Sequence, residues 1–136
     1  VEEHIEAVKI ANGLGIAVDA FTMIYPWEDE QDLFDTTEMV KQIAQNKVNG
    51  VDEKGRTMKN HVDSTIMTPY QGTQFFDMIQ IGDLPGVKMI PEIDPGKLYY
   101  KGNHAGSGWP YLKTRLPKEQ YEEAQAFRNS LRPKYR

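Results

Sequence analysis

Residues 23–33 have the sequence Met-Ile-Tyr-Pro-Trp-Glu-Asp-Glu-Gln-Asp-Leu and mark a change from strand to helix. Residues 16–24 are almost all apolar or small, which is typical of a strand covered on both faces. Asp29 can cap a helix that we expect over about 29–44. Pro26, between the two elements, suits neither of them. The stretch therefore predicts a loop at the carboxyl end of a buried strand.

A second junction of the same kind lies further along the chain. Residues 62–68 form the second expected strand, and the sequence Pro-Tyr-Gln-Gly-Thr follows at 69–73. Pro69 ends strand pairing, Gly72 permits a close approach of the backbone, and Thr73 can cap a short helix. Two strands separated by a helix predict a parallel pair with a right-handed crossover. Both loops would then lie along one edge of the sheet, where open α/β sheets bind ligands.

The remaining segments complete an α/β chain. Residues 2–12 have the spacing of an amphipathic helix, residues 45–60 form a long polar connection, and a last helix starts at Pro117. Residues 85–115 are rich in proline and glycine and predict an irregular segment. Two strands are too few to close a barrel, so either this segment adds strands or the chain is part of something larger.

The last helix has an apolar stripe and a basic end. The stripe consists of Tyr121, Ala124, Phe127 and Leu131. The basic residues at and beyond its end are Arg128, Arg132, Lys134 and Arg136. Positive side chains there complement the negative end of the helix dipole, and a contact with a phosphate or a partner is the alternative.

The composition excludes several classes of function. With 136 residues and a mass of 15.6 kDa, the chain favours one domain. Its net charge of -4 gives no strong field for nucleic acid. It has neither an apolar run of about 18 residues nor a signal-peptide pattern, so we expect a cytoplasmic protein with no membrane partner. No cysteine is present, so the chain cannot form a disulfide, a thiolate nucleophile or a cysteine-held cluster.

Other candidate sites have simple structural explanations. His4, His61 and His104 lack the spacing of metal ligands. Residues 102–108, Gly-Asn-His-Ala-Gly-Ser-Gly, match neither a dinucleotide fingerprint nor a phosphate loop nor a nucleophile elbow, so a flexible loop is expected. The acidic residues at 28–32 are expected to be helix-start charges rather than an acid–base pair. We therefore assign no catalytic residue and no metal ligand.

Residues 25–28, Tyr-Pro-Trp-Glu, could line a ligand pocket, or Trp27 could simply pack over the sheet edge. Followed by Asp-Glu-Gln-Asp, they resemble the GYPWET-x-E-D version of the fifth-strand motif in radical S-adenosylmethionine (SAM) enzymes. The match is closest to the cobalamin-binding branch that includes anaerobic magnesium-protoporphyrin ester cyclase and related methyltransferases. Residues 68–73 resemble the TPYPGT motif of the sixth strand. Residues 2–16 resemble the helix before the fifth strand, and residues 111–120 resemble the segment leading into the last helix, all in family order.

The chain departs from this family at several points. Ile24 stands where the family has glycine, Asp29 stands where it has threonine, and the connection at 45–60 is longer than usual. The cysteine triplet that binds the [4Fe-4S] cluster is absent, as is a cobalamin domain. The resemblance therefore implies the C-terminal part of such an enzyme. Residues 1–84 would be a fragment of a partial (β/α) barrel of the TIM type with parallel strands, and residues 85–136 an irregular extension ending in a helix.

The resemblance also implies a binding site. The residues that would border the adenosyl group of SAM are Met23, Ile24, Tyr25, Pro26, Met67, Thr68, Pro69 and Tyr70. Those that would face a small-molecule substrate are Trp27, Glu28 and Gly72. The parent enzyme, an oxidoreductase or methyltransferase, would use SAM and a [4Fe-4S] cluster, with or without cobalamin. Its reaction would be reductive cleavage of SAM, followed by radical methylation or cyclisation of an unreactive carbon.

The partners follow from the same resemblance. This chain alone would be inactive, because the cluster and cobalamin domains would lie in the rest of the same polypeptide. The alternative is a non-catalytic module, a split subunit or docking domain that binds a protein partner. An isolated barrel fragment exposes strand edges and apolar faces, so the chain by itself is expected to self-associate as a homodimer or to be conformationally loose.

Overall fold

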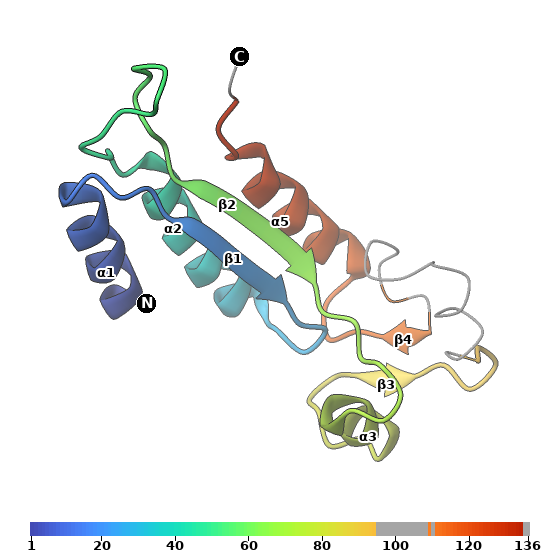
Figure 1. Ribbon diagram of the computed structural model, residues 1–136. Coiled ribbons are helices and arrows are strands. Elements are labelled where there is room, and N and C mark those ends of the chain that lie inside the picture. The colour runs from blue at the N-terminus through green and yellow to red at the C-terminus, as the bar shows by residue number, and fades with distance from the viewer. Residues whose placement is uncertain (95–108, 110, 135–136) are drawn as a thin grey trace. The chain divides into compact units, whose positions relative to one another are not determined.

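The computed structural model describes residues 1–94, 109 and 111–134. The elements in chain order are α1 (Glu2–Gly13), β1 (Asp19–Ile24), α2 (Glu30–Gln45), β2 (His61–Ile66), α3 (Gln74–Gln80), β3 (Lys88–Met89), β4 (Leu112–Lys113) and α5 (Lys118–Ser130), as Figure 1 shows. This is the mixed α/β composition predicted from the sequence. The loop predicted at 102–108, with His104, lies outside the described residues. In the part of the chain that is described, no helix is both long and apolar enough to cross a membrane.

The strands β1 and β2 form a two-stranded parallel sheet. The His61 N–H donates to the Val18 carbonyl oxygen at 2.9 Å, and the Met67 N–H donates to the Ile24 carbonyl oxygen at 2.8 Å. The spacing along the chain is the same for both bonds, so the two strands run in the same direction (Figure 1). Because α2 lies between them in the chain, the predicted strand–helix–strand unit is confirmed.

The chain divides into two compact units, each discontinuous in sequence. The first unit comprises Val1–Thr22, Phe34–Ser64 and Ala126–Arg136, and the second comprises Met23–Leu33 and Thr65–Gln125. The boundary expected near residue 84 concerns the parts of a parent enzyme and stays a prediction.

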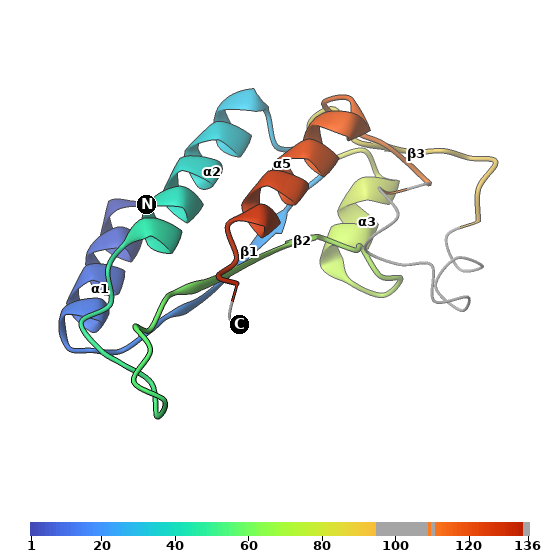
Figure 2. The same ribbon diagram turned by 90° about the horizontal axis from the view of Figure 1, so that it is seen from above.

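The core of the first unit lies between its helices and one face of the sheet. It consists of Val8, Val40, Ile43 and Val62, with Val18, Ala20, Met39, Ala44 and Leu131 packed against it. Figure 2 shows α1 and α2 on the same side of β1 and β2. Val40 and Ile43 are buried and lie three residues apart in α2, which is the spacing of one face of a helix.

β1 differs from its predicted form in length and in burial. It spans Asp19–Ile24 rather than residues 16–24, and its residues alternate between outward and inward positions. Phe21 is 73% exposed and Met23 is 44% exposed, whereas Ile24 is fully buried. The prediction of a strand covered on both faces is wrong, because α1 and α2 pack on one face while apolar side chains occupy both.

Buried asparagine side chains join the ends of α1, α2 and β2. Asn60 Oδ1 accepts hydrogen bonds from the Val18 N–H at 2.9 Å and from Asn12 Nδ2 at 2.8 Å. Asn60 Nδ2 donates to the Ile43 carbonyl oxygen and to Asn12 Oδ1, both at 2.8 Å. Asn46 Nδ2 also donates to Asn12 Oδ1, at 2.6 Å. This asparagine cluster satisfies backbone groups that are shielded from water, which rigidifies a core when the network is complete.

A side chain from α5 covers the outer edge of β2. Asn129 Oδ1 accepts a hydrogen bond from the Ser64 N–H at 2.8 Å, and Asn129 Nδ2 donates to the Ser64 carbonyl oxygen at 3.0 Å. The amide thus makes the two bonds that a neighbouring strand would make. Covering an edge in this way is a known protection against unwanted strand pairing.

We expect the isolated chain to dimerise through β1. Within the described residues β1 pairs only with β2, so its other edge presents backbone groups to a second chain. Light scattering coupled to size exclusion should show a mass that falls on dilution. Asn129→Ala, which removes the two bonds to Ser64, should increase self-association, whereas Ser130→Ala on the same turn should not. A monomer at all concentrations, with strongly protected β1 amides, would contradict the expectation.

The last helix corrects two details of the sequence analysis. α5 begins at Lys118, directly after Pro117, as its N-terminal signal predicts. Phe127, however, is 44% exposed, and Arg128 beside it is fully buried, with its Nε donating to Thr37 Oγ1 at 3.0 Å. The predicted burial of Phe127 is therefore wrong, and Arg128 has an interior position in addition to its predicted place in the last turn of α5. A hydrogen bond from another helix makes the long, partly apolar arginine side chain suitable for an interior position.

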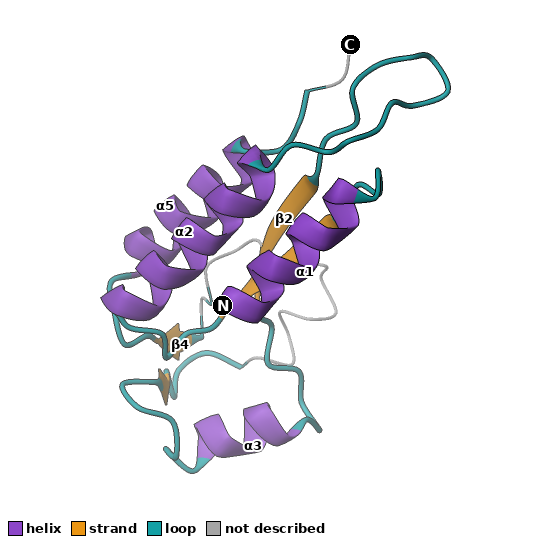
Figure 3. Ribbon diagram, turned by 90° about the vertical axis from the view of Figure 1, so that its left-hand side faces the viewer, coloured by secondary structure: helices purple, strands orange, loops and turns teal. Residues whose placement is uncertain are grey.

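The core of the second unit is rich in aromatic side chains. It consists of Ile24, Leu33, Ile66, Ile79, Val87, Trp109, Tyr111, Leu112 and Tyr121. β3 and β4 pair antiparallel, with Lys88 opposite Lys113 and Met89 opposite Leu112, and α3 packs against β3 (Figure 3). The segment at 85–115, predicted to be irregular, thus contributes two short strands to a sheet separate from that of β1 and β2.

Candidate functional site at the carboxyl ends of the parallel strands

The two loops predicted to bind a ligand begin where β1 and β2 end. The hydrogen bond from Met67 to Ile24 joins the residues at the ends of the two strands, so the loops at 25–28 and 68–72 leave from the same end of the sheet. Both loops belong to the second unit. This is the placement expected for a parallel pair, whose carboxyl ends meet at one edge.

The predicted site residues fall into two groups by burial. The residues whose side chains are buried in the second unit are Ile24, Pro26, Met67 and Pro69. Met23 is 44% exposed and Tyr70 is 47% exposed, and Tyr25 and Thr68 are half-buried. The first group can therefore fix the course of the backbone but cannot present a side chain to a ligand. The second group can contact a ligand directly.

Three aromatic rings gather at this edge. The ring of Tyr25 is stacked on that of Trp27, with centroids 4.8 Å apart and planes inclined by 29°. Phe75, in the first turn of α3, lies 5.3 Å from Trp27 and 6.3 Å from Tyr25 and is 43% exposed. Aromatic pairs at such distances attract one another beyond their burial of area. The sequence analysis missed Phe75, and the only signal for it was its place two residues after the Thr73 cap.

Hydrogen bonds within the first loop fix its turn into α2. The Tyr25 N–H donates to Glu28 Oε1 at 3.1 Å. The Asp32 N–H donates to Asp29 Oδ1 at 2.9 Å, and the Asp29 N–H donates to Asp32 Oδ2 at 3.0 Å. This reciprocal pair is a capping box, in which each side chain satisfies a backbone donor of the helix start. The prediction that Asp29 caps α2 is confirmed, and these carboxylates act as helix-start groups.

Side chains of the segment before α5 bind backbone carbonyl groups at the start of the second loop, the one at 68–72. Trp109 Nε1 donates to the Met67 carbonyl oxygen, and the Tyr111 hydroxyl donates to the Pro69 carbonyl oxygen at 3.4 Å. Lys118 Nζ in turn donates to the Trp109 carbonyl oxygen at 2.7 Å. The bonds of Trp109 and Tyr111 each join residues that are 42 positions apart in the chain. They satisfy carbonyl groups that no longer belong to the strand ladder.

The same C-terminal segment holds the first loop. The Arg115 N–H donates to the Pro26 carbonyl oxygen at 3.0 Å, and Arg115 Nη1 donates to the Trp27 carbonyl oxygen at 3.3 Å. The Tyr121 hydroxyl lies 2.7 Å from the Glu28 carbonyl oxygen and accepts the Leu116 N–H at 3.2 Å. Trp109 and residues 111–121 therefore set the shape of both loops. The sequence analysis gave these residues no role at the site, because nothing local connects them to strand ends so distant in the chain.

Two glycines are needed here for different reasons. Gly86 has φ 70°, and a Cβ on it would lie 2.8 to 2.9 Å from atoms of Arg115, so only glycine fits beside that residue. Gly72 has φ 85°, but no atom of the described residues lies within 4 Å of the place a Cβ would take. The described part of the chain therefore does not use the close approach that Gly72 permits. Its requirement is the left-handed conformation of the turn into α3.

The groups with shifted pKa values at the site, Tyr121, Asp29 and Lys118, all take part in the hydrogen bonds that hold the loops and the start of α2. Burial raises the pKa of the Tyr121 hydroxyl above its usual value of 10.0, so this group stays neutral and keeps its hydrogen bonds. The backbone N–H of Asp32, and then the nearby Arg115 cation, lower the pKa of Asp29. Burial lowers the pKa of Lys118. Among the described residues no group of three histidine, aspartate or glutamate side chains could hold a metal ion.

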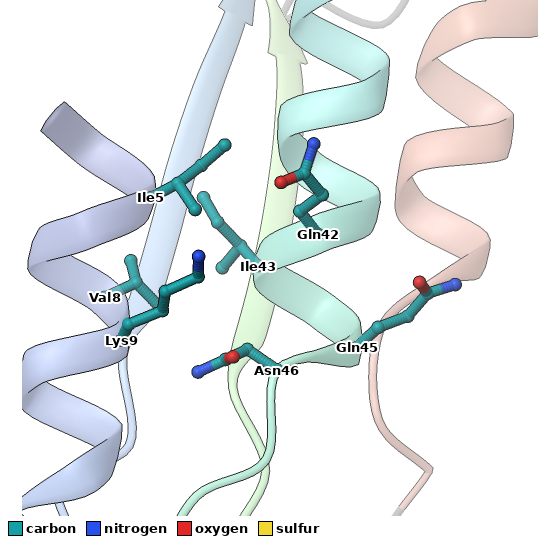
Figure 4. Close-up of a pocket in the computed structure, with 7 residues that line it drawn as sticks. All are labelled: Ile5, Val8, Lys9, Gln42, Ile43, Gln45 and Asn46. Atoms are coloured by element: carbon teal, nitrogen blue, oxygen red, sulfur yellow. The ribbon is translucent and has the colours of Figure 1, made fainter. Parts of the chain in front are cut away.

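A separate hollow of about 260 Å³ lies in the first unit, between α1 and α2. Figure 4 shows the side chains that line it, which are Ile5, Val8, Lys9, Gln42, Ile43, Gln45 and Asn46. None of the residues predicted to bind SAM or substrate lines it. Two of its apolar lining residues, Val8 and Ile43, belong to the core of this unit (Figure 4).

Comparisons with known proteins give no relative. No family model, no curated protein and no solved structure matches this chain. The likeness to radical SAM enzymes therefore rests on the ordered motifs of the sequence.

Proposed function

We propose that this chain is the C-terminal part of a radical SAM enzyme and forms one wall of its active site. The observation that carries the proposal is the placement of the two resembling motifs. Residues 25–28 and 68–73 follow adjacent parallel strands at their carboxyl ends, in register. In barrels built from parallel strands and helices, the loops at this end carry the active site.

The burial of β1 supports the same proposal. Helices cover one face of the strand, and its outward residues include the exposed Phe21 and Met23. In a (β/α) barrel, helices cover the outer face of each strand, and side chains from the other strands fill the inner face. An open face that carries large apolar side chains is what a barrel strand would present without its neighbours. The edge of β1 that does not pair with β2 would then pair with the preceding strand of the barrel.

The residues present suit SAM but not its cluster. No cysteine occurs in the chain, so a [4Fe-4S] cluster would be held elsewhere in the polypeptide, where it would supply the electron that cleaves SAM. Thr68 Oγ1 is buried and has no hydrogen-bond partner among the described residues. A polar ligand at this edge would satisfy it. The half-buried ring of Tyr25 and the exposed ring of Tyr70 would lie along the adenosyl group, and Trp27, Glu28 and Gly72 would face the substrate.

In this reading, the chain's own contribution is orientation. The backbone of both loops is held by Trp109 and residues 111–121, so the aromatic rings need little reordering when a ligand binds. Preorganised groups bind more tightly because less conformational entropy is lost. Radical methylation or cyclisation of an unreactive carbon requires such control, since a carbon radical reacts with whatever lies nearest.

We expect the chain alone to be colourless, to bind no iron and to form no 5′-deoxyadenosine from SAM under reducing conditions. The physical reason is the absence of thiolates. The polypeptide encoded by the complete reading frame, reconstituted with iron and sulfide without oxygen, should instead form 5′-deoxyadenosine. A complete reading frame without a cysteine triplet, or a reconstituted protein that leaves SAM intact, would refute the proposal and favour a non-catalytic docking module.

The site itself is tested in that complete polypeptide. Tyr25→Ala should raise the KM for SAM about tenfold, since it removes a stacking ring at the edge of the sheet. The matched control is Phe34→Ala on α2, because Phe34 is 60% exposed and belongs to the first unit. Equal effects of the two variants would show that Tyr25 acts on folding alone.

A further inference from the structure

A second hollow in the first unit has a strongly basic lining. Its volume is about 440 Å³. The residues that line it are Ala44, Gln45, Asn46, Lys47, Val48, Thr57, Met58, Lys59, Asn60, Leu131, Arg132, Pro133 and Lys134. Four of them are cations, and none is an aspartate or a glutamate. The whole chain has a net charge of -4, whereas the residues that line this hollow carry a positive net charge.

The four cations come from three separate segments. Lys47 follows the end of α2, Lys59 precedes β2, and Arg132 and Lys134 follow α5. Arg132 is held in place, because its Nη2 pairs with Asp63 and lies 3.3 Å from Asn129 Oδ1. The sequence analysis noted only the basic residues after the last helix. The fold adds two lysines that are remote in sequence and gives the group a concave shape.

The helix dipole explains this group only in part. Cations near the ends of α2 and α5 complement the negative ends of those helices, but the effect falls off within the last turn. Lys59 lies at the end of the long connection before β2, so no helix end accounts for it. Asp63 forms an ion pair with Arg132. Four cations therefore meet at a hollow whose lining residues include no carboxylate, and the helix ends account for only some of them.

We propose that this hollow binds a small molecule carrying two or more phosphoryl groups. Lysine and arginine side chains are the usual phosphate partners, and several cations around one concavity match a ligand with several negative charges. The amides and hydroxyl among the lining residues, such as Gln45 and Thr57, add neutral donors. A nucleic acid would call for a basic stripe along an element, and the cations here surround a hollow instead.

This binding site is independent of the SAM proposal. None of the residues assigned to SAM or substrate lines it, and all of its residues belong to the first unit. Its ligand could therefore be found even if the radical chemistry were disproved.

Pyrophosphate is the probe, and isothermal titration calorimetry on this chain is the measurement. We expect saturable binding that weakens as salt rises, with orthophosphate binding more weakly. Lys47→Glu and Lys134→Glu should each weaken pyrophosphate binding by at least about tenfold. Lys54→Glu is the matched control, because it makes the same change of net charge at an exposed residue of the same connection that does not line the hollow. It should leave affinity within about twofold.

Several outcomes would overturn the proposal. One is the absence of binding at low salt by a chain whose circular dichroism shows it to be folded. Another is an equal loss of affinity in Lys54→Glu, which would show a response to net charge rather than a site. A third is tighter binding of a single-stranded oligonucleotide than of pyrophosphate, which would assign the surface to nucleic acid.

Discussion

Replacing Asn60 with alanine is expected to lower the free energy of unfolding by about 3–5 kcal/mol. The side chain is 1% exposed and makes hydrogen bonds to Val18, Asn12 and Ile43. Its removal takes away the side-chain partner of the Val18 N–H and of the Ile43 carbonyl oxygen, and two of the four hydrogen bonds of the Asn12 amide. Each such group costs about 1–3 kcal/mol. Urea denaturation followed by circular dichroism measures the change, and the slope of the transition should stay constant.

Asn49→Ala is the matched control for this variant. Asn49 is exposed, and its contribution to the cluster is a backbone N–H that donates to the Asn12 carbonyl oxygen at 2.9 Å. Alanine keeps that bond, so a change within about 0.5 kcal/mol is expected. Similar losses in Asn49→Ala and Asn60→Ala would mean that the asparagine cluster carries no special weight in the first unit.

Replacing Tyr121 should have the largest effect on the second unit. The ring is fully buried, meets Trp109 edge-on with centroids 5.2 Å apart, and carries the hydroxyl that anchors the first loop at Glu28. Tyr121→Ala should cost about 3–5 kcal/mol, since it empties the core and releases the loop. Tyr121→Phe keeps the ring and should cost about 1–3 kcal/mol for the unsatisfied Leu116 N–H and Glu28 carbonyl.

The control for Tyr121 lies on the same helix. Phe127→Ala removes an aromatic ring that is 44% exposed and should cost about 1 kcal/mol or less. If Phe127→Ala were as damaging as Tyr121→Ala, the burial pattern of α5 would be wrong. If Tyr121→Phe were neutral, its hydroxyl would not be what holds the first loop.

The pH dependence of Tyr121→Phe gives a second readout. Burial raises the pKa of Tyr121 above 10.0, so the folded state favours the neutral hydroxyl. The contribution of such a group is complete below pH 10.0 and is lost as pH rises, because the unfolded chain releases its proton first. The stability gap between the natural chain and Tyr121→Phe should therefore shrink above pH 10.0. A gap that grew in that range would contradict the assigned direction.

The sequence predicted the features that depend on local signals. Asp29 with Asp32 marked the start of α2, and Thr73 marked the start of α3, where its Oγ1 accepts the Phe76 N–H at 3.3 Å. A capping residue acts within one turn, so its neighbours in sequence reveal it. The parallel pairing of β1 and β2 followed from the helix between them, because the crossover rule depends only on the order of elements.

The features that sequence analysis missed depend on contacts distant in the chain. Trp109 reaches Met67 across 42 residues, and Asn12 reaches Asn60 across 48 residues. Neither residue type, nor its spacing, indicates such a partner. The error at Phe127 has the same origin, because helical spacing gives the direction of a side chain but not what covers it. Arg128 is interior because Thr37 is present to accept its hydrogen bond.

The amide of Asn129 imitates a neighbouring strand at one edge of the sheet, and this limits how copies of the chain can assemble. A filament grows when each subunit has two unpaired strand edges. One edge pairs with the subunit before it and the other with the subunit after it. Here Asn129 occupies the edge of β2 at Ser64, so within the described part of the β1–β2 sheet the edge of β1 is the one left for another chain. Two chains that pair through β1 around a twofold axis use both of these edges, so association through this sheet stops at two chains rather than continuing into an amyloid-like fibre.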